Sequence, residues 1–225
     1  MIVTLDGPAG AGKSSVARAL AARLGFRFLD TGAMYRAVAW AALQQKLDWN
    51  DSHALDQLTR KLDIRVTEDQ VLLDGRDVTK IIRTMEVTGV IHHVADNPNV
   101  RGQLVELQRQ AAATGDFVTE GRDQGTVVFP KAKCKVFLTA SPAERARRRM
   151  ADLRNRGEQL TMEEVLSRQN ARDDRDRSRA VGALIAADDA ILFDTSNMEL
   201  DEVVDQLEAI VRERLPLPKP EGEHA

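Results

Sequence analysis

GPAGAGKS, residues Gly7–Ser14, decides the fold of this chain. The stretch matches the pattern G-x-x-x-x-G-K-[ST] at every constrained position. An apolar run at Ile2–Leu5 precedes it and predicts a buried strand, and the helix-spaced segment Lys13–Leu24 follows it directly. A strand, a glycine-rich turn and a helix in this order predict a phosphate-binding loop.

Each constrained residue of this loop has a chemical task. Gly7, Gly10 and Gly12 permit backbone conformations that aim successive N–H groups at a phosphate, and the helix that follows adds its positive end. Lys13 is expected to reach the β- and γ-phosphates of ATP, and the hydroxyl of Ser14 is expected at Mg²⁺, largely through water and ATP. The residues expected to bind ATP are Gly7, Pro8, Ala9, Gly10, Ala11, Gly12, Lys13, Ser14 and Ser15. A glycine-rich turn without a ligand would not require a lysine followed by a serine.

Composition and charge limit the classes of function. The chain has 225 residues, 43% of them hydrophobic and 30% charged, which predicts one globular domain with insertions. Aromatic residues make up 4%, too few for stacking single-stranded nucleic acid, and the net charge of -3 predicts no general attraction to nucleic acid or to a membrane. A single cysteine, Cys134, and the absence of a secretory leader pattern lead us to expect a cytoplasmic protein.

Apolar runs alternate with helix-spaced segments, which predicts crossover connections and a parallel sheet. Strands are expected at Ile2–Leu5, Phe26–Leu29, Phe117–Thr119, Lys135–Leu138 and Ile191–Phe193. Helices are expected at Lys13–Leu24, Thr31–Gln45, Val100–Ala113, Pro142–Asn155, Met162–Arg179 and Leu200–Arg214. Two short β-like runs between Leu62 and Asp77, closed by Asp74-Gly75, predict a small antiparallel insertion.

The region around Gly157 joins two of these helices. A basic helix end, RRRMADLRNRG, leads into polar residues, and Thr161 with Glu164 three residues later predicts the N-cap of the next helix. A mobile helical flap and a plain helical hairpin both fit this pattern. The proline-rich tail, 216–225, is expected to be disordered.

The segment LDTGAMYR, Leu29–Arg36, joins a predicted strand to a predicted helix. Thr31 and the backbone N–H groups of Gly32 and Ala33 predict a second helix start that can receive an anion, with Arg36 one turn later. An ordinary N-cap at Asp30 or Thr31 is the alternative interpretation.

A second polar segment, TEGRDQGTVVFP at 119–130, also follows a predicted strand. Glu120, Arg122 and Asp123 are therefore expected at the carboxyl edge of the sheet, where open α/β folds bind their ligands. A surface turn without a ligand is the alternative.

The densest run of charges is ARDDRDRSR, Ala171–Arg179. On a helix, Arg172, Asp176 and Arg179 share one face, so that two cations flank a carboxylate. A solvated helix face is the alternative interpretation of such a run.

A phosphate-binding loop by itself does not distinguish a kinase from a GTPase or a motor ATPase. A GTPase is expected to carry an N-K-x-D motif that reads guanine, and the sequence has none. An apolar strand that ends in Asp-Glu, typical of many motor ATPases, is also missing. These observations favour a kinase.

The motifs together resemble those of the bacterial cytidylate kinase family. GPAGAGKS, LDTGAMYR, DVTKIIRTMEV, NPNVRGQL, EGRDQGTVVFP and RDDRDRSRAV occur in the order of that family and cover the chain from Ile2 to about Arg214. The resemblance implies an α/β P-loop kinase fold with a five-stranded parallel sheet flanked by helices, in one domain over 1–215. It also implies an insertion at about 56–97 that binds the nucleoside monophosphate and contains the small antiparallel sheet, and a short helical lid at about 155–173.

The resemblance also implies roles for individual residues. Lys13, Arg36 and Arg122 would be catalytic and would bracket the acceptor phosphate. The residues that would contact the acceptor are Thr31, Arg36, Arg101, Arg122, Asp123, Arg172, Asp176 and Arg179, with Arg101, Asp123 and Arg179 at the base and Arg172 and Asp176 at the sugar. Arg148, Arg149, Arg154 and Arg156 are candidates for lid arginines. Three positions depart from the family pattern: His92 replaces a small hydroxyl residue, Gln124 replaces a methionine, and VGAL after Arg179 replaces an alanine-proline pair.

The resemblance implies the transfer of a phosphoryl group from ATP to CMP, with dCMP as a second acceptor. It also leads us to expect a monomeric enzyme. The nucleophile is a phosphate oxygen that is anionic near neutral pH, so a catalytic base is not required, and positive charge and alignment are expected to supply the catalysis. Another small-acceptor kinase, such as an adenylate or shikimate kinase, is the alternative enzyme. A catalytically idle regulator that binds ATP is the alternative from another class.

Overall fold

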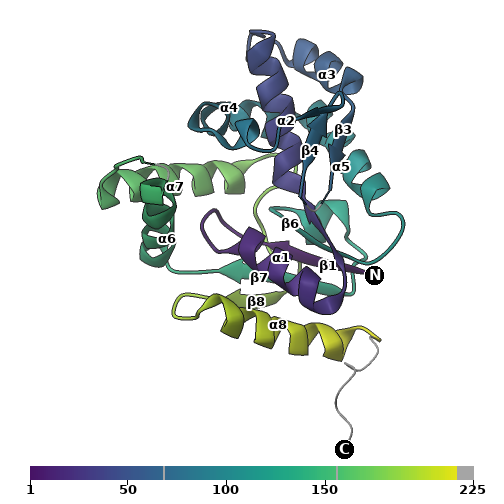
Figure 1. Ribbon diagram of the computed structural model, residues 1–225, viewed down its shortest axis with the longest axis vertical. Coiled ribbons are helices and arrows are strands. Elements are labelled where there is room, and N and C mark those ends of the chain that lie inside the picture. Colours follow the sequence, from purple (N-terminus) through teal and green to yellow (C-terminus); the bar gives the residue numbers. More distant parts are fainter. Residues whose placement is uncertain (68, 156, 217–225) are drawn as a thin grey trace, which may run out of the picture.

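The computed structural model describes residues 1–67, 69–155 and 157–216. A five-stranded sheet lies at its centre, with the strand order β2-β6-β1-β7-β8 and parallel pairing throughout (Figure 1). The strands are β1 (Ile2–Asp6), β2 (Arg27–Asp30), β6 (Phe117–Gly121), β7 (Cys134–Thr139) and β8 (Ile191–Asp194). The predicted α/β fold with a five-stranded parallel sheet is confirmed.

One face of this sheet is covered by α1 (Lys13–Leu24) and α8 (Leu200–Arg214), which contact each other. Successive side chains of a strand point to opposite faces, so Val3 and Leu5 of β1 enter this layer together. They join a cluster that includes Val16 and Leu20 of α1 and Leu207 of α8. This packing fixes the start of α1, and with it the turn that connects β1 to α1.

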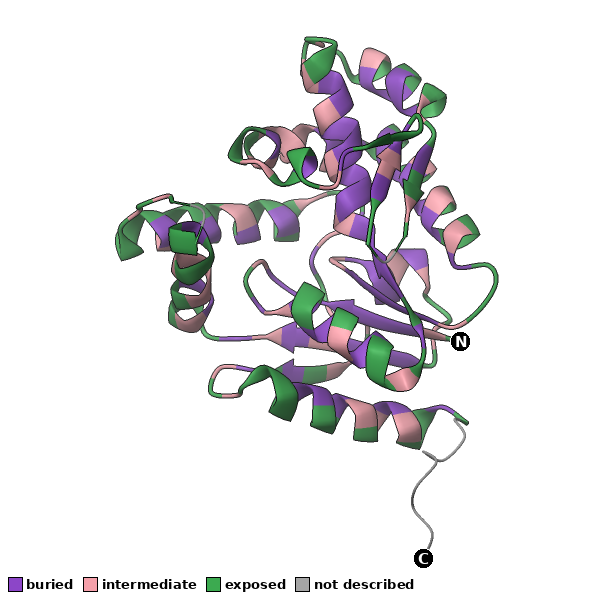
Figure 2. Ribbon diagram, in the orientation of Figure 1, coloured by how far each residue is buried: buried purple, intermediate pink, exposed green. Residues whose placement is uncertain are grey.

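The other elements of the first half of the chain form a second apolar cluster with the small sheet. They are α2 (Thr31–Gln44), α3 (Ser52–Lys61), β3 (Ile64–Val66), β4 (Val71–Leu73), β5 (Arg76–Asp77), η1 (Ile81–Arg83), α4 (Met85–Ala95) and α5 (Pro98–Ala111). The sheet β3-β4-β5 is antiparallel, and Asp74 and Gly75, both with positive φ, turn the chain between β4 and β5. The predicted antiparallel insertion is confirmed. Figure 2 shows the buried residues concentrated in α2 and in the central sheet.

An arm of two helices, α6 (Pro142–Asn155) and α7 (Met162–Ser178), extends from the sheet (Figure 1). The predicted cap of α7 is confirmed: Thr161 Oγ1 accepts a hydrogen bond from the N–H of Glu164, and the Glu164 carboxylate accepts from the N–H of Thr161. The apolar contact between the two helices is confined to a small cluster around Ala146, Leu153 and Val165.

Two helices were not predicted from the sequence. α3 is short and charged, and its start depends on Asp51, whose side chain accepts from the N–H of Ala54. α4 reads MEVTGVIHHVA, in which β-branched residues and a glycine lower the intrinsic helix propensity. Packing against α2 stabilises α4 instead. α5 begins two residues earlier than predicted because Asn97 caps it and Pro98 takes the first helical position.

The tail predicted to be disordered spans 216–225. All of it except Pro216 lies outside the described residues. Within the described ranges, every helix is too short or too polar to cross a lipid bilayer.

Candidate active site

The turn between β1 and α1 has the conformation that its glycines permit. Gly7, Gly10 and Gly12 all have positive φ, with values of 146°, 82° and 88°. A Cβ at Gly7 would overlap the carbonyl of Leu138 in β7, so the turn can lie against the sheet only with a glycine there. Gly12 is the N-cap of α1 and provides no side-chain cap, which leaves the first N–H groups of the helix available to an anion.

Lys13 is folded back into this turn. Its Nζ donates to the carbonyl oxygen of Pro8 at 2.8 Å, and the residue is buried. Burial, followed by the positive charge of Arg122, lowers the pKa of Lys13 to about 7. A pKa of about 7 means that this lysine exchanges its proton close to neutral pH.

Donor binding should for this reason be accompanied by proton uptake above pH 7. Lys13 loses its proton as the pH rises through about 7 in the ligand-free protein, whereas a phosphate polyanion beside it favours the charged form. Calorimetric titration with ADP at about pH 8, in buffers with different ionisation enthalpies, should show roughly one proton taken up per nucleotide bound. Heats that are the same in every buffer would contradict this expectation. The same titration of a Lys13→Ala variant is the control, and its proton uptake should be lost.

Glu120, the penultimate residue of β6, links the two helix starts. Its Oε1 accepts from Ser14 Oγ at 2.8 Å, and its carbonyl oxygen accepts from Thr31 Oγ1 at 2.6 Å. A hydroxyl and a carboxylate are the hard oxygen ligands that Mg²⁺ prefers, directly or through water. Ser14 and Glu120 therefore fit a magnesium ion that arrives with ATP. Elsewhere, the described residues contain no cluster of three or more His, Cys, Asp or Glu that could hold a metal ion.

The start of α2 is an ordinary N-cap, which was the alternative interpretation of LDTGAMYR. Asp30 accepts from the N–H of Ala33 at 3.0 Å, and its other oxygen pairs with Arg83 at 2.7 Å. Asp30 thus occupies the Ala33 amide and Thr31 donates to Glu120, while the role of this helix start at an anion stays a prediction.

Arg36 and Arg122 hold different partners in the ligand-free protein. Arg36 donates to Thr88 Oγ1 in α4 at 2.8 Å. Nε of Arg122 donates to Asp176 in α7 at 2.8 Å. Arg122 is also close enough to Lys13 to lower its pKa, which places both cations at the carboxyl edge of the sheet.

Arg101 of α5 and Asp123, which follows β6, form an ion pair whose side chains are 4% and 6% exposed. The Arg101 guanidinium also lies 5.5 Å from the centre of the Tyr35 ring. Gly182 covers the pair, since a Cβ there would overlap both charged groups. The VGAL segment, which departs from the family pattern, therefore places Gly182 directly on these two residues.

Asp176 is the meeting point of the charged run on α7. It pairs with Arg122 at 2.8 Å and with Arg179 at 2.7 Å, and Arg172 lies 4.0 Å away. Although burial opposes the charged form, Arg122, Arg172 and Arg179 lower the pKa of Asp176 below its ordinary value. The solvated-face interpretation fits Asp174 and the other exposed residues, but it is wrong for Asp176.

Asp6, at the end of β1, is a site residue that sequence analysis missed. Its two oxygens accept from the N–H groups of Gln124 at 2.8 Å and Gly125 at 2.7 Å, at the start of the π-helical turn η2 (Gln124–Val128). Burial raises the pKa of Asp6 to about 6, although these hydrogen bonds oppose the shift. The signal available in the sequence was a carboxylate at the end of an apolar strand, directly before Gly7.

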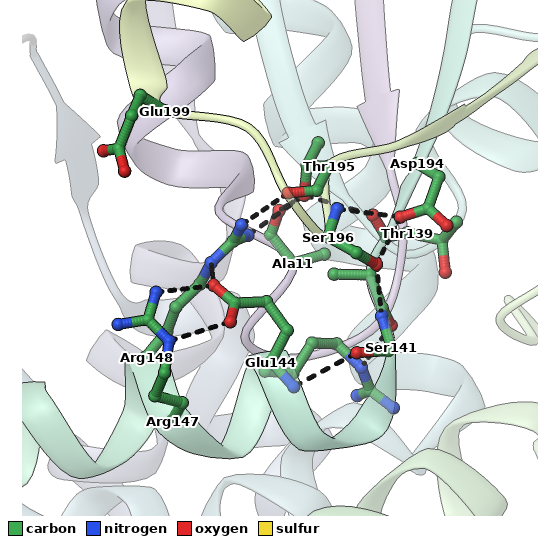
Figure 3. A network of polar contacts seen from close by, with 12 residues as sticks. Ala11, Thr139, Ser141, Glu144, Arg147, Arg148, Asp194, Thr195, Ser196 and Glu199 are labelled. Atoms are coloured by element: carbon green, nitrogen blue, oxygen red, sulfur yellow. Dashed lines mark hydrogen bonds and ion pairs between the residues drawn. The ribbon is translucent and has the colours of Figure 1, made fainter.

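On the other side of the P-loop, Arg148 of α6 takes part in a network with the loop after β8 (Figure 3). It donates to the carbonyl oxygen of Thr195 at 2.6 Å and to Thr195 Oγ1 at 3.0 Å, and it pairs with Glu144 at 2.8 Å. The single hydroxyl hydrogen of Thr195 can be donated to the carbonyl oxygen of Thr139 at 3.1 Å or to that of Ala11 at 3.4 Å. Arg148 therefore fixes Thr195, a residue that lies against both β7 and the P-loop.

The other candidate lid residues lie away from this network. Arg149 approaches Met85, Arg154 is exposed, and Arg156 lies outside the described residues. His92 and His93 lie with ring centres 4.0 Å apart on α4.

Comparisons with known proteins agree with the sequence motifs. The model of the cytidylate kinase family matches residues 3–213. A cytidylate kinase of Rhodopirellula baltica is 51% identical over 213 residues, which cover 95% of this chain and 93% of the relative. Cytidylate kinase 1 of Haemophilus influenzae is 45% identical over 216 residues, with 94% of each chain covered. A solved structure of an uncharacterised protein from Eubacterium ventriosum, 12% identical, covers 95% of this chain and 99% of its own with a TM-score of 0.55, which bears on the fold alone.

Proposed function

The chain belongs to the cytidylate kinase family, and on this premise we propose that it transfers the γ-phosphoryl group of ATP to CMP, giving ADP and CDP, and that it also accepts dCMP. The observation that carries the proposal is the position of three groups at one edge of the sheet. The P-loop with Lys13 follows β1, and Arg122 and the Arg101–Asp123 pair lie at the end of the adjacent β6 or beside it. A donor site, a cationic centre and a base reader therefore adjoin one another.

The donor phosphates are assigned to Gly7–Ser15, with Lys13 released from Pro8 to reach them. Bound Mg²⁺ would neutralise phosphate charge, held by Ser14 with Glu120 in support. Lys13, Arg36 and Arg122 would surround the migrating phosphoryl group. The acceptor phosphate supplies its own anionic oxygen, so these cations need only align the two polyanions and stabilise the transition state.

The acceptor is assigned to the elements around Asp176. Arg101 and Asp123 would exchange their ion pair for hydrogen bonds to cytosine, with Arg179 nearby, and Arg172 and Asp176 would hold the sugar hydroxyls. Thr31 is also assigned to the acceptor, with its hydroxyl held by the carbonyl oxygen of Glu120.

The functions of the insertion and of the helical lid also stay proposals. The insertion at about 56–97 would close over the acceptor, and the segment at about 155–173, with Arg148, Arg149 and Arg154, would form a lid that excludes water from the reaction. That the enzyme acts as a monomer in the cytoplasm, within one domain over 1–215, stays a prediction from the sequence.

An Asp176→Ala variant should lose affinity for the acceptor while it retains affinity for ATP. Charge-assisted hydrogen bonds of this kind correspond to roughly a ten- to hundredfold rise in the KM for CMP. The rise should be smaller for dCMP, which lacks the 2′-hydroxyl. Steady-state kinetics with both acceptors and a binding titration with ATP would measure these effects, and Asp174→Ala, an exposed change two residues away, is the matched control. Equal weakening of ATP and CMP binding would refute the assignment of Asp176.

The activity itself is tested by a coupled assay of ADP release with CMP, dCMP, UMP and AMP as acceptors. The proposal expects rapid release with CMP, slower or similar release with dCMP, and little with UMP or AMP. Preference for AMP, or for shikimate in a parallel assay, would point to another small-acceptor kinase. No ADP release with any acceptor, despite ATP binding, would point to an idle regulator.

A further inference from the structure

The buried face of α7 is mostly polar. After Val165 in the first turn, the buried residues of this helix are Gln169, Asp173 and Asp176. Nε2 of Gln169 donates to the carbonyl oxygen of Pro142 at 3.1 Å, and Asp176 holds its arginines as described. Hydrogen bonds and ion pairs, in place of apolar packing, therefore hold the second half of α7. Contacts of this kind can be exchanged when a charged ligand arrives.

The central contact on this face is the ion pair between Asp173 and Arg145 of α6. Its two charged atoms lie 2.7 Å apart, and the side chains are 4% exposed for Arg145 and 2% for Asp173. The same guanidinium donates to the carbonyl oxygen of Ala9 in the P-loop at 3.0 Å and to that of Ala140 after β7 at 3.2 Å. One buried side chain thus joins α7, the P-loop and the central sheet.

The P-loop end of this connection lies beside Lys13. Lys13 now occupies the carbonyl oxygen of Pro8, and the next carbonyl along the chain, that of Ala9, accepts from Arg145. Gly10 then packs against Arg145 so closely that a Cβ on Gly10 would lie 3.1 Å from the Cβ of Arg145. A phosphate in the P-loop would draw the Lys13 ammonium towards itself, and the segment that carries the Pro8 and Ala9 carbonyl oxygens is the one that contacts Arg145.

The α7 end of the connection leads to the acceptor site. Asp173 lies one turn before Asp176 on the same buried face, and Asp176 pairs with Arg122 and Arg179. The second carboxylate oxygen of Asp173 is buried and has no hydrogen-bond partner among the described residues. A buried acceptor without a donor is costly, so a shift of α7 that gave this oxygen a donor would be favoured.

We propose that Arg145 and Asp173 are positioning residues that couple the donor site to the acceptor site, so that ATP in the P-loop tightens the binding of CMP at α7. The inference rests on the proposed function. Coupling of this kind is reciprocal, so CMP tightens the binding of ATP by the same factor. Neither residue needs to contact a substrate for this effect, because Arg145 acts through the Ala9 carbonyl and Asp173 acts through the position of Asp176.

The test is the affinity for CMP, measured by calorimetry with and without a saturating non-hydrolysable ATP analogue and Mg²⁺. The wild-type protein should bind CMP about tenfold more tightly with the analogue present. The variant is the double change Arg145→Met with Asp173→Leu, because replacing both members of a buried ion pair by apolar groups leaves no unpaired charge and preserves folding better than removing one. Asp174→Leu, at the exposed neighbouring position on α7, is the matched control.

The double variant should bind CMP alone and the analogue alone within about threefold of the wild type, while the coupling factor falls to near one. Arg145→Lys, which keeps the positive charge, should retain part of the coupling and serves as a second variant if the double change does not fold. A folded variant with the wild-type coupling factor would overturn the proposal, as would a wild-type protein that binds both ligands independently. Loss of CMP affinity that is equal with and without the analogue would also overturn it. A wild-type protein that does not bind CMP at all would instead refute the proposed function.

Discussion

Phosphoryl transfer should fall by at least about a hundredfold in a Lys13→Ala variant, the size of effect seen when one preorganised charge or donor is removed from a transition state. Lys13 is the one P-loop side chain that can place a positive charge on the transferred phosphates. Turnover of CMP under saturating ATP measures the effect, and Lys61→Ala, an exposed lysine at the end of α3, is the control. Turnover near that of the wild type would contradict the assignment of the P-loop.

The same variant should remain folded. The pKa of Lys13 is lowered from an ordinary value of 10.5 to about 7, so the unfolded chain binds the proton more tightly than the folded protein does. This lysine therefore costs the ligand-free protein stability at and below pH 7, and the cost disappears as the pH rises from about 7 towards 10.5. Removing Lys13 removes this cost. The Tm of the variant at neutral pH should therefore be at least as high as that of the wild type.

Discrimination between cytosine and uracil should decrease in an Asp123→Asn variant. Cytosine offers an amino group where uracil has a carbonyl oxygen, so a carboxylate accepts a hydrogen bond from the first and repels the second. In a buried site such hydrogen bonds discriminate by up to about 10⁴-fold. An amide can rotate to donate, so kcat/KM should fall for CMP and should fall less, or even rise, for UMP. Kinetics with both acceptors would measure the ratio, and Asp123 is not the base reader if that ratio keeps its wild-type value.

The Asp123→Asn variant should also be less stable, because Asp123 forms a buried ion pair with Arg101. Asp123→Asn leaves a buried guanidinium without its counter-charge in the ligand-free protein, a change that costs about 3–5 kcal/mol. Chemical unfolding should detect this loss. Asp188→Asn, at an exposed position, is the matched control and should change neither the stability nor the ratio of acceptors.

Much of the fold could be predicted from the sequence because its signals are local. The P-loop depends on glycines at positions with positive φ, and the start of α7 depends on Thr161 and Glu164, which bond to each other's backbone. The segment of α4 was not among the strongest predicted helices, because its β-branched residues lower helix propensity and packing on α2 stabilises the helix. LDTGAMYR was ambiguous for a similar reason, since the residues around Asp30 fit either a bound anion or the N-cap that is found.

By itself, the sequence determined the P-loop and the parallel sheet, which depend on neighbouring residues or on periodic spacing. Its ordered motifs also identified the family, and the residues expected at each part of the site follow from that resemblance. Only the tertiary structure decided which charges meet. Arg101 and Asp123 are 22 residues apart, and Arg122 and Asp176 are 54 apart. No periodicity links such positions, and every arginine in the chain is a chemically acceptable partner for every carboxylate. Their pairing is decided by the sheet order, which brings the end of β6 beside β1, and by the direction in which α7 returns to that edge.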